Sequence, residues 1–396
     1  MPESASWAVR LSGDHFLTQA LHRSYAVIPA EDADTAPLLS WDDLNTILAT
    51  HRIDPPRLRL SQDGQTVPVS RYSMPTTSRR GVTWNRLHPA QLHARLAEGA
   101  SLVVDAIDEI HPPIRSSAED LERFVGTPVQ TNAYASWTEQ EGFGRHWDDH
   151  DVVVVQQYGA KRWRLWEPTR LAPTFRDVDS PEEPEGEPVA DFVLLPGDVL
   201  YLPRGWWHSV TADQGTESLH LTFGLVAQTG ATLVGWLVDE LHESTVMRMD
   251  VPRHGAPDAK AAYQNELRTA LLTALSDPGL IDRWALSTDT THFGRPAPSL
   301  PYVDALPADK DIAVRLTAPR AELTSNPGAG TVTLSAAGTA WDFAERAAPA
   351  LRILMTGDIA SIGELADAAG LEVKDAAGVL TALVQGQALA IVKANR

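Results

Sequence analysis

The residues best suited to chemistry in this chain are two histidines and an aspartate from two separate segments. His146 and Asp148 stand two positions apart, and His208 comes much later in the sequence. Successive side chains on a strand alternate faces, so a strand through the first pair would point both side chains the same way. Two imidazoles and one carboxylate hold ferrous iron and leave coordination positions open. The spacing predicts a metal site whose third ligand comes from a neighbouring strand.

Composition limits the classes of partner. The 396 residues predict two or three domains, and a hydrophobic content of 43% is enough for buried cores. The net charge of −19 disfavours binding to nucleic acid or anionic membranes and favours basic partners. With no cysteine, any metal has nitrogen and oxygen ligands. The chain shows neither a secretory pattern nor an apolar run of about 20 residues, so we expect a soluble cytoplasmic protein.

The elements expected around the metal residues are mostly strands. The first hundred residues mix strand signals with helices predicted at 41–51 and 89–98, and from 129 to 225 the pattern is β. Val152 to Gln156 is a β-branched run, Gly159-Ala160 is a turn, and Arg162 to Trp166 alternates. Short strands separated by Gly/Pro turns favour a double-sheet jelly roll with its site between the sheets.

The second half of the chain is expected to be largely helical. Trp/Leu stripes between 231 and 291 indicate helices that bury intramolecular surface or form a dimer interface. A Pro-rich linker at 295–307 precedes a predicted hairpin of 314–316 with 331–334. Helices near 341–355, 359–369 and 373–385 and a strand at 388–392 then give the outline of a winged helix.

At these residues the chain resembles the JmjC-domain ribosomal oxygenases, which are cupin-superfamily protein hydroxylases that depend on Fe(II) and 2-oxoglutarate. Three segments carry the resemblance: the His146–Asp149 run, the stretch from Val152 to Trp166, and Leu195 to His208 with its glycines. The resemblance implies a mainly β catalytic domain with the double-stranded β-helix (jelly-roll) JmjC cupin fold at 1–228. It also implies an α-helical dimerisation region at 229–308 and a C-terminal winged-helix domain at 309–396.

The resemblance also implies roles for individual residues. His146, Asp148 and His208 are then the iron ligands, and Lys161 is the base that binds the distal carboxylate of 2-oxoglutarate. A buried carboxylate needs such a charge beside it. The remaining candidates are two co-substrate contacts on one strand, and two histidines that would support the ligands or touch the substrate: Asn132, Tyr134, His150 and His220. On a regular strand, His150 would face the same way as both ligands, where the family has an apolar residue.

Each of these positions has a plainer alternative. The metal trio can be a hydrogen-bonded polar cluster inside a barrel, and Lys161 can be a surface lysine at a hairpin. Asn132, Tyr134 and His220 can be ordinary strand residues, and we expect the tryptophans Trp163, Trp166, Trp206 and Trp207 to be core. The acidic segment from Asp177 to Asp191 is expected to be a solvated loop, with recruitment of a basic substrate as the alternative.

The resulting functional hypothesis is a homodimeric 2-oxoglutarate-dependent dioxygenase. It would hydroxylate an arginine or histidine side chain of a basic protein, by resemblance one of the large ribosomal subunit. Alternatives are a hydroxylase of another peptide or a small metabolite, a JmjC demethylase, an inactive metal-binding scaffold, and a DNA-binding regulator. The DNA-binding alternative is disfavoured because residues 341–396 contain seven acidic and only five basic residues. Such a segment offers little positive charge to the phosphates of DNA.

Overall fold

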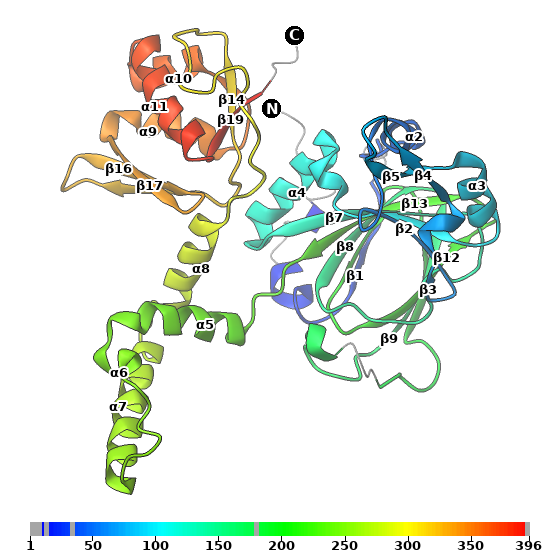
Figure 1. Ribbon diagram of the computed structural model, residues 1–396, viewed down its shortest axis with the longest axis horizontal. Coiled ribbons are helices and arrows are strands. Elements are labelled where there is room, and N and C mark those ends of the chain that lie inside the picture. The colour runs from blue at the N-terminus through cyan, green and yellow to red at the C-terminus, as the bar shows by residue number, and fades with distance from the viewer. Residues whose placement is uncertain (1–9, 12–15, 32–35, 178–181, 393–396) are drawn as a thin grey trace. The chain divides into compact units, whose positions relative to one another are not determined.

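The computed structural model of the protein describes residues 10–11, 16–31, 36–177 and 182–392 (Figure 1). The chain divides into two compact units, Met1–Ala227 and Gln228–Arg396. In the described residues, no helix is both long and apolar enough to cross a membrane.

The first unit is built mainly from strands. They are β1 (Ala26–Ile28), β2 (Leu58–Gln62), β3 (Gln65–Thr66), β4 (Ser73–Thr77), β5 (Thr83–Leu87), β6 (Ser101–Val104), β7 (Val129–Ser136), β8 (Asp151–Tyr158), β9 (Ala160–Trp166), β10 (Ala190–Leu194), β11 (Val199–Leu202), β12 (Trp207–Asp213) and β13 (Ser218–Leu225). The helices are α2 (Trp41–Thr50), α3 (Pro89–Ala97) and α4 (Pro112–Val125), with a π turn at Phe16–Ala20 and short 3-10 turns at Val69–Arg71, Ile107–Glu109 and Phe175–Asp177.

Two sheets face each other across the first unit, as a jelly roll requires. The larger has the strand order β1-β11-β8-β13-β7-β6-β2-β3, and the smaller has the order β10-β9-β12. The β-branched run in β8 is buried on both faces, because Val153 and Val155 pack into one cluster and Val152 and Val154 into another. The predicted β catalytic fold, with further helical parts, is therefore confirmed.

Backbone irregularities set the positions of the strands that flank the site. The β8–β9 turn passes through Gly159, which has a left-handed backbone (φ +65°), and a Cβ there would lie 1.9 Å from the Glu217 carbonyl oxygen. The register of β13 on β8 shifts between Leu219 and His220. Such bulges re-aim side chains and are common beside active sites.

The second unit begins with helices and ends in a mixed α/β region. Its helices are α5 (Gly230–Glu240), α6 (Thr245–Arg248), α7 (Pro257–Leu275), α8 (Leu280–Thr291), α9 (Ala348–Met355), α10 (Ile362–Ala369) and α11 (Val373–Gln385), with 3-10 turns at Leu241–Glu243 and Glu345–Ala347. Its strands are β14 (Ala313–Leu316), β15 (Glu322–Asn326), β16 (Thr331–Ala336), β17 (Thr339–Ala344), β18 (Ala360–Ser361) and β19 (Leu389–Val392).

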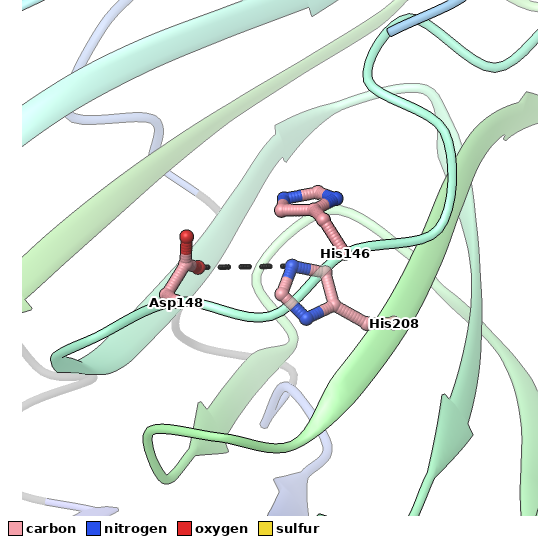
Figure 2. Close-up of side chains that lie close together, drawn as sticks. All are labelled: His146, Asp148 and His208. Atoms are coloured by element: carbon pink, nitrogen blue, oxygen red, sulfur yellow. Dashed lines mark ion pairs between the residues drawn. The ribbon is translucent and has the colours of Figure 1, made fainter. Parts of the chain in front are cut away.

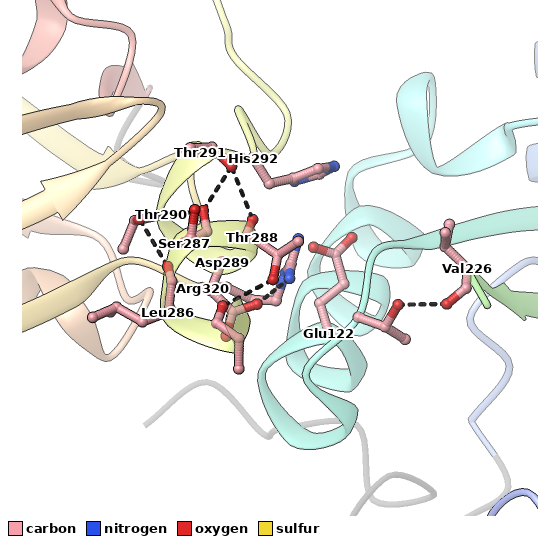
Figure 3. A network of polar contacts seen from close by, with 12 residues as sticks. Glu122, Val226, Leu286, Ser287, Thr288, Asp289, Thr290, Thr291, His292 and Arg320 are labelled. Atoms are coloured by element: carbon pink, nitrogen blue, oxygen red, sulfur yellow. Dashed lines mark hydrogen bonds and ion pairs between the residues drawn. The ribbon is translucent and has the colours of Figure 1, made fainter. Parts of the chain in front are cut away.

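A buried ion pair fastens the last helix of the helical segment to the region that follows it. The Arg320 guanidinium donates to Asp289 of α8, and the Arg320 side chain is only 4% exposed (Figure 3). Burial raises the pKa of Asp289, and the Arg320 charge works against that rise. Hydroxyls of Thr290 and Thr291 donate back to carbonyls of the same helix.

Two predictions for the C-terminal region are wrong. Residues 314–316 do not form a hairpin with 331–334, because β14 pairs with β18 and β19 while β16 pairs with β15 and β17. The helix expected from residue 341 begins only at Ala348, since 339–344 form β17. The hairpin prediction failed because a local pattern indicates a strand but not the distant segment with which it pairs. The helix prediction failed at its start because pairing of 339–344 with β16 overrides the local helical pattern.

Candidate metal centre and its cavity

A pair of backbone hydrogen bonds brings the two candidate histidines together. The His146 N–H donates to the His208 carbonyl at 3.0 Å, and the His208 N–H donates to the His146 carbonyl at 2.7 Å. The two imidazole centroids lie 4.3 Å apart. The Gly205 N–H also donates to the Asp148 carbonyl at 3.0 Å, so the loop carrying the aspartate is tied to the turn that leads into β12.

The three side chains converge on one point (Figure 2). Each of His146, Asp148 and His208 offers a ligand atom, and these atoms all lie within 4.8 Å of one another. The His208 Nε2 and the Asp148 Oδ2 are 3.7 Å apart. Three nitrogen and oxygen donors grouped in this way suit a divalent transition metal and leave its other positions open.

The outer nitrogens of both imidazoles are occupied by the backbone. The Nδ1 of His146 lies 3.0 Å from the Gly144 carbonyl oxygen, and the Nδ1 of His208 lies 3.0 Å from that of Trp206. A carbonyl oxygen can only accept, so we assign the proton to Nδ1 in both rings. Each Nε2 is then an unprotonated ligand atom, and its ring orientation is set by the backbone.

The charges of the trio are arranged as metal binding requires. Burial, and to a lesser degree the neighbouring His146, lowers the pKa of His208 to about 4, so its imidazole is neutral at physiological pH. For Asp148, burial works against ionisation, but the neighbouring histidines lower the pKa of the carboxyl below its ordinary value. A neutral imidazole and an ionised carboxylate are the forms that bind a cation.

The structure corrects the expected local geometry of the first two ligands. The strand β8 begins at Asp151, so Asp148 lies in a loop, and His146 forms only an isolated bridge. His150 therefore does not share a face with the ligands through strand alternation. Its Nδ1 lies 2.9 Å from Asp149, its ring packs on Gly224, and it is not among the described residues that line the cavity. Its charge nevertheless helps to lower the Asp148 pKa.

A cavity of about 240 Å³ opens beside the trio, between the two sheets. The side chains that line it come from both sheets and from the loops around them: Arg59, Ser101, Tyr134, Ala135, Phe143, Gly144, His146, Asp148, Val152, Lys161, Trp163, His208, Val210, His220 and Thr222. The expected site between the sheets is thus a real cavity, and three of the side chains predicted beside the ligands line it.

Lys161 is a buried side chain in the lining of this cavity. It is 4% exposed, its Nζ donates to the Ser136 hydroxyl, and burial lowers the pKa of its ammonium to about 7. The surface-lysine alternative is therefore wrong. A buried amine with a hydroxyl partner is only partly satisfied, and a bound anion would favour its charged form.

The other predicted contacts are divided between the cavity and the scaffold. Tyr134 lines the cavity, and burial raises its pKa to about 12, so it is a neutral hydroxyl. His220 stacks on Tyr134 with 5.0 Å between centroids, and burial lowers its pKa well below the usual range. Asn132 is not among the described lining residues, and its Oδ1 accepts from the Ala106 N–H at 2.9 Å.

Sequence reasoning missed several lining residues, above all Arg59, Phe143 and Ser101. Arg59 belongs to β2, far from the motifs in sequence, and Phe143 lies just before the first ligand. A short alternating strand with one arginine is common, so no local signal distinguished Arg59 from a surface residue. Trp163, which we expected only as core, also lines the cavity.

Comparison with known proteins places the site in a defined domain. Residues 109–233 match the JmjC domain family. The chain is 31% identical over 173 residues to a Drosophila pseudoobscura protein named bifunctional lysine-specific demethylase and histidyl-hydroxylase NO66, which covers 43% of this chain and 18% of that protein. It is 35% identical over 143 residues to rat ribosomal oxygenase 2, and this match covers 34% of this chain and 30% of the rat protein. The chain therefore contains a JmjC domain, and it spans less than a third of the length of these relatives.

The fold is also that of a particular solved protein, YcfD, a ribosomal oxygenase from Escherichia coli. The match covers 96% of this chain and 97% of YcfD with a TM-score of 0.61, at 18% sequence identity. A second structure, of YcfD in complex with cobalt and 2-oxoglutarate, matches with a TM-score of 0.62 at 18% identity, covering 96% of this chain and 98% of that one. The predicted resemblance to JmjC ribosomal oxygenases is confirmed in sequence for the JmjC region and in fold for nearly the whole chain.

Replacing one ligand should weaken metal binding strongly, whereas the same change at its neighbour should have little effect. We expect Asp148→Asn to weaken Co(II) binding on the order of 100-fold or more, because a carboxylate donor is lost. Asp149→Asn is the matched control, since Asp149 bonds to His150 and does not line the cavity. Titration calorimetry measures both affinities, and equal losses in the two variants would contradict this assignment.

Proposed function

We propose that this protein is an Fe(II)- and 2-oxoglutarate-dependent dioxygenase that hydroxylates an arginine or histidine side chain of a ribosomal protein. The observation that carries the proposal is the convergence of His146, Asp148 and His208 on a cavity that also contains the buried Lys161. The YcfD complex with cobalt and 2-oxoglutarate supports the choice of metal class and co-substrate. The name of rat ribosomal oxygenase 2 supports the choice of a ribosomal target, and the name histidyl-hydroxylase of the NO66 relative supports hydroxylation of a side chain.

The residues present fit both groups. Three nitrogen and oxygen donors suit Fe(II), and Lys161 is a buried amine to which the described residues offer no carboxylate partner. The Nδ1 of His220 is buried without a hydrogen-bond partner, on a side chain that lines the same cavity. Lys161 and Tyr134 would hold the distal carboxylate, with His220 beside them, and Asn132 would support this wall through Ala106.

The chain's own residues position the reaction and protect it from water. When bound, iron and 2-oxoglutarate supply the chemistry that activates O₂ and inserts one oxygen atom into a C–H bond. Lys161 fixes the orientation of the co-substrate by a charge-assisted hydrogen bond, and neutral Tyr134 offers a hydroxyl. Val152, Val210 and Phe143 give the cavity apolar walls, which limit water near the reacting carbon. His150, whose Nδ1 contacts Asp149, would support the loop that carries Asp148.

Long-range charge and location are consistent with this target. The net charge of −19 would attract a basic ribosomal protein, and Glu183 of the acidic loop is held near the first ligand by an ion pair with Arg145. We place the protein in the cytoplasm, where such a substrate is made. Demethylation of lysine, which the NO66 name includes, uses the same ligand set and is the second candidate.

The function is tested by the mass of the substrate. In ribosomal proteins isolated from cells with and without this gene, we expect one tryptic peptide of a large-subunit protein to lose one oxygen atom in the deletion. The purified protein with Fe(II) and 2-oxoglutarate should restore that mass and release succinate. If no ribosomal peptide differs, or if a methyl group is lost instead, the proposed target or reaction is wrong.

Co-substrate affinity should depend on pH through Lys161. Its free pKa of about 7 would rise on binding a dianion, so above pH 7 binding must take up a proton. With metal saturating, we expect the affinity for 2-oxoglutarate to fall roughly tenfold per pH unit above pH 7 and to level off below it. Titration calorimetry of Lys161→Met should give weaker binding at pH 6.5 and no such slope. Lys310→Met, in the second unit, is the control.

We propose separate roles for the two parts of the second unit: a homodimer contact through α5–α8 and a winged helix at 309–396 that binds protein rather than DNA. None of the residues of α7 is buried, and Leu272 and Leu275 are 56% and 47% exposed. Exposed apolar side chains on a long helix suit association with a second copy. The helix α11 carries Lys374 and Asp375 and then mostly small or apolar residues, which gives little for DNA to contact.

One light-scattering experiment tests both roles. We expect the wild-type protein to elute with the mass of two chains, and the mass to stay unchanged when duplex DNA is added at physiological salt. Leu272→Glu should give one chain, because it buries a charge in the contact. Lys260→Glu, an exposed position on the same helix, should remain a dimer. A single-chain wild-type mass or a DNA-dependent shift would refute the corresponding role.

A further inference from the structure

Arg59 is the unexpected charge in the metal cavity. It lies on β2, and its side chain is 34% exposed, whereas Lys161 is 4% exposed. The two cations therefore differ in burial: Lys161 is enclosed, and Arg59 lines the same cavity with part of its side chain in contact with solvent. A substrate side chain that reaches the metal enters a cavity lined by the Arg59 charge.

The Arg59 guanidinium is held in place rather than free to swing away. Its Nε donates to Asp105 at 2.8 Å and its Nη2 at 3.3 Å, and it lies over the Phe143 ring at 5.7 Å. Burial works against its charge, but the bond to Asp105 raises the pKa of Arg59, so it stays charged.

The cavity offers a cationic side chain no free carboxylate. Among the described lining residues the carboxylate is Asp148, which the metal would occupy, and Asp105 is not one of them. The other polar side chains of the lining bring the Arg59 and Lys161 cations or carry no negative charge, as in Tyr134, Ser101, Thr222 and His220. A second guanidinium or an ammonium would be desolvated beside a like charge, which is costly, whereas a neutral acceptor would be satisfied.

We propose that Arg59 is a specificity-determining residue that admits a neutral, hydrogen-bond-accepting side chain, such as imidazole, and rejects arginine and lysine. This inference rests on the proposed function and narrows it to one of its two target residues. It also separates two scales of recognition. The acidic surface attracts a basic protein, and Arg59 then selects a neutral side chain within it.

The test uses full-length protein loaded with Mn(II) and 2-oxoglutarate under argon. The probes are histidine and arginine blocked as N-acetyl methylamides. Mn(II) broadens proton signals of any side chain that visits the metal. We expect the wild-type protein to broaden the histidine probe at least tenfold more than the arginine probe. Arg59→Gln should reduce this ratio to within about threefold of unity, and Arg59→Lys should keep the preference because it keeps the charge.

Arg57→Gln is the matched control. Arg57 is on the same side of the unit but bonds to the Ala106 carbonyl and Glu109, and it does not line the cavity. In Arg57→Gln, the ratio of histidine-probe broadening to arginine-probe broadening should equal that of the wild-type protein. The inference is overturned if the wild-type protein broadens the arginine probe as much as the histidine probe, or if Arg59→Gln leaves the ratio unchanged. Calorimetry separates the two levels: lack of Mn(II) and 2-oxoglutarate binding refutes the proposed function itself, while normal binding without selectivity refutes only the role of Arg59.

Discussion

Two reciprocal backbone hydrogen bonds between His146 and His208 are the constraint on which the site depends. They join the loop that carries His146 to the beginning of β12, and they bring the two imidazole rings to a centroid distance of 4.3 Å. Backbone carbonyls then bind both Nδ1 atoms, so the ligand atoms are chosen by main-chain geometry. A site built on backbone contacts keeps its ligands in place without a cation, because it does not rely on flexible side chains to form it.

The cavity beside the ligands is polar at a cost in stability. Lys161 and His220 are both 4% exposed, and burial lowers the pKa of each side chain. Lowered pKa values favour the neutral forms, as expected for basic groups that have lost contact with water. The surrounding jelly roll tolerates them because its core is extensive on both sides of the larger sheet. Such arrangements are expected where a ligand completes the hydrogen bonding, and they explain why a stable core encloses groups that would otherwise be unfavourable.

Charge acts at two distances in the proposed function. At long range, an excess of acidic residues draws in a basic partner, and this attraction is weakened by salt. At short range the sign is reversed, because Arg59 and Lys161 make the cavity rich in cations and donors. Attraction at the surface therefore does not predict which side chain is accepted inside. Because net charge acts only on the whole partner protein, it does not distinguish an arginine target from a histidine target.

The sequence by itself determined the ligand types and the β region around them, because ligand chemistry and strand periodicity are written in neighbouring residues. The expectation for Lys161 came from the family resemblance instead, and the structure decided that this side chain is buried in the cavity. The sequence also located most helices, including α11 at the predicted 373–385. Only the tertiary structure decided that Asp148 lies in a loop, that His150 turns away onto Gly224, and that β14 pairs with β18 and β19. Arg59 entered the cavity in the same way, from a strand far along the chain. Contacts between distant segments depend on packing and register across the whole fold, and no local pattern carries that information.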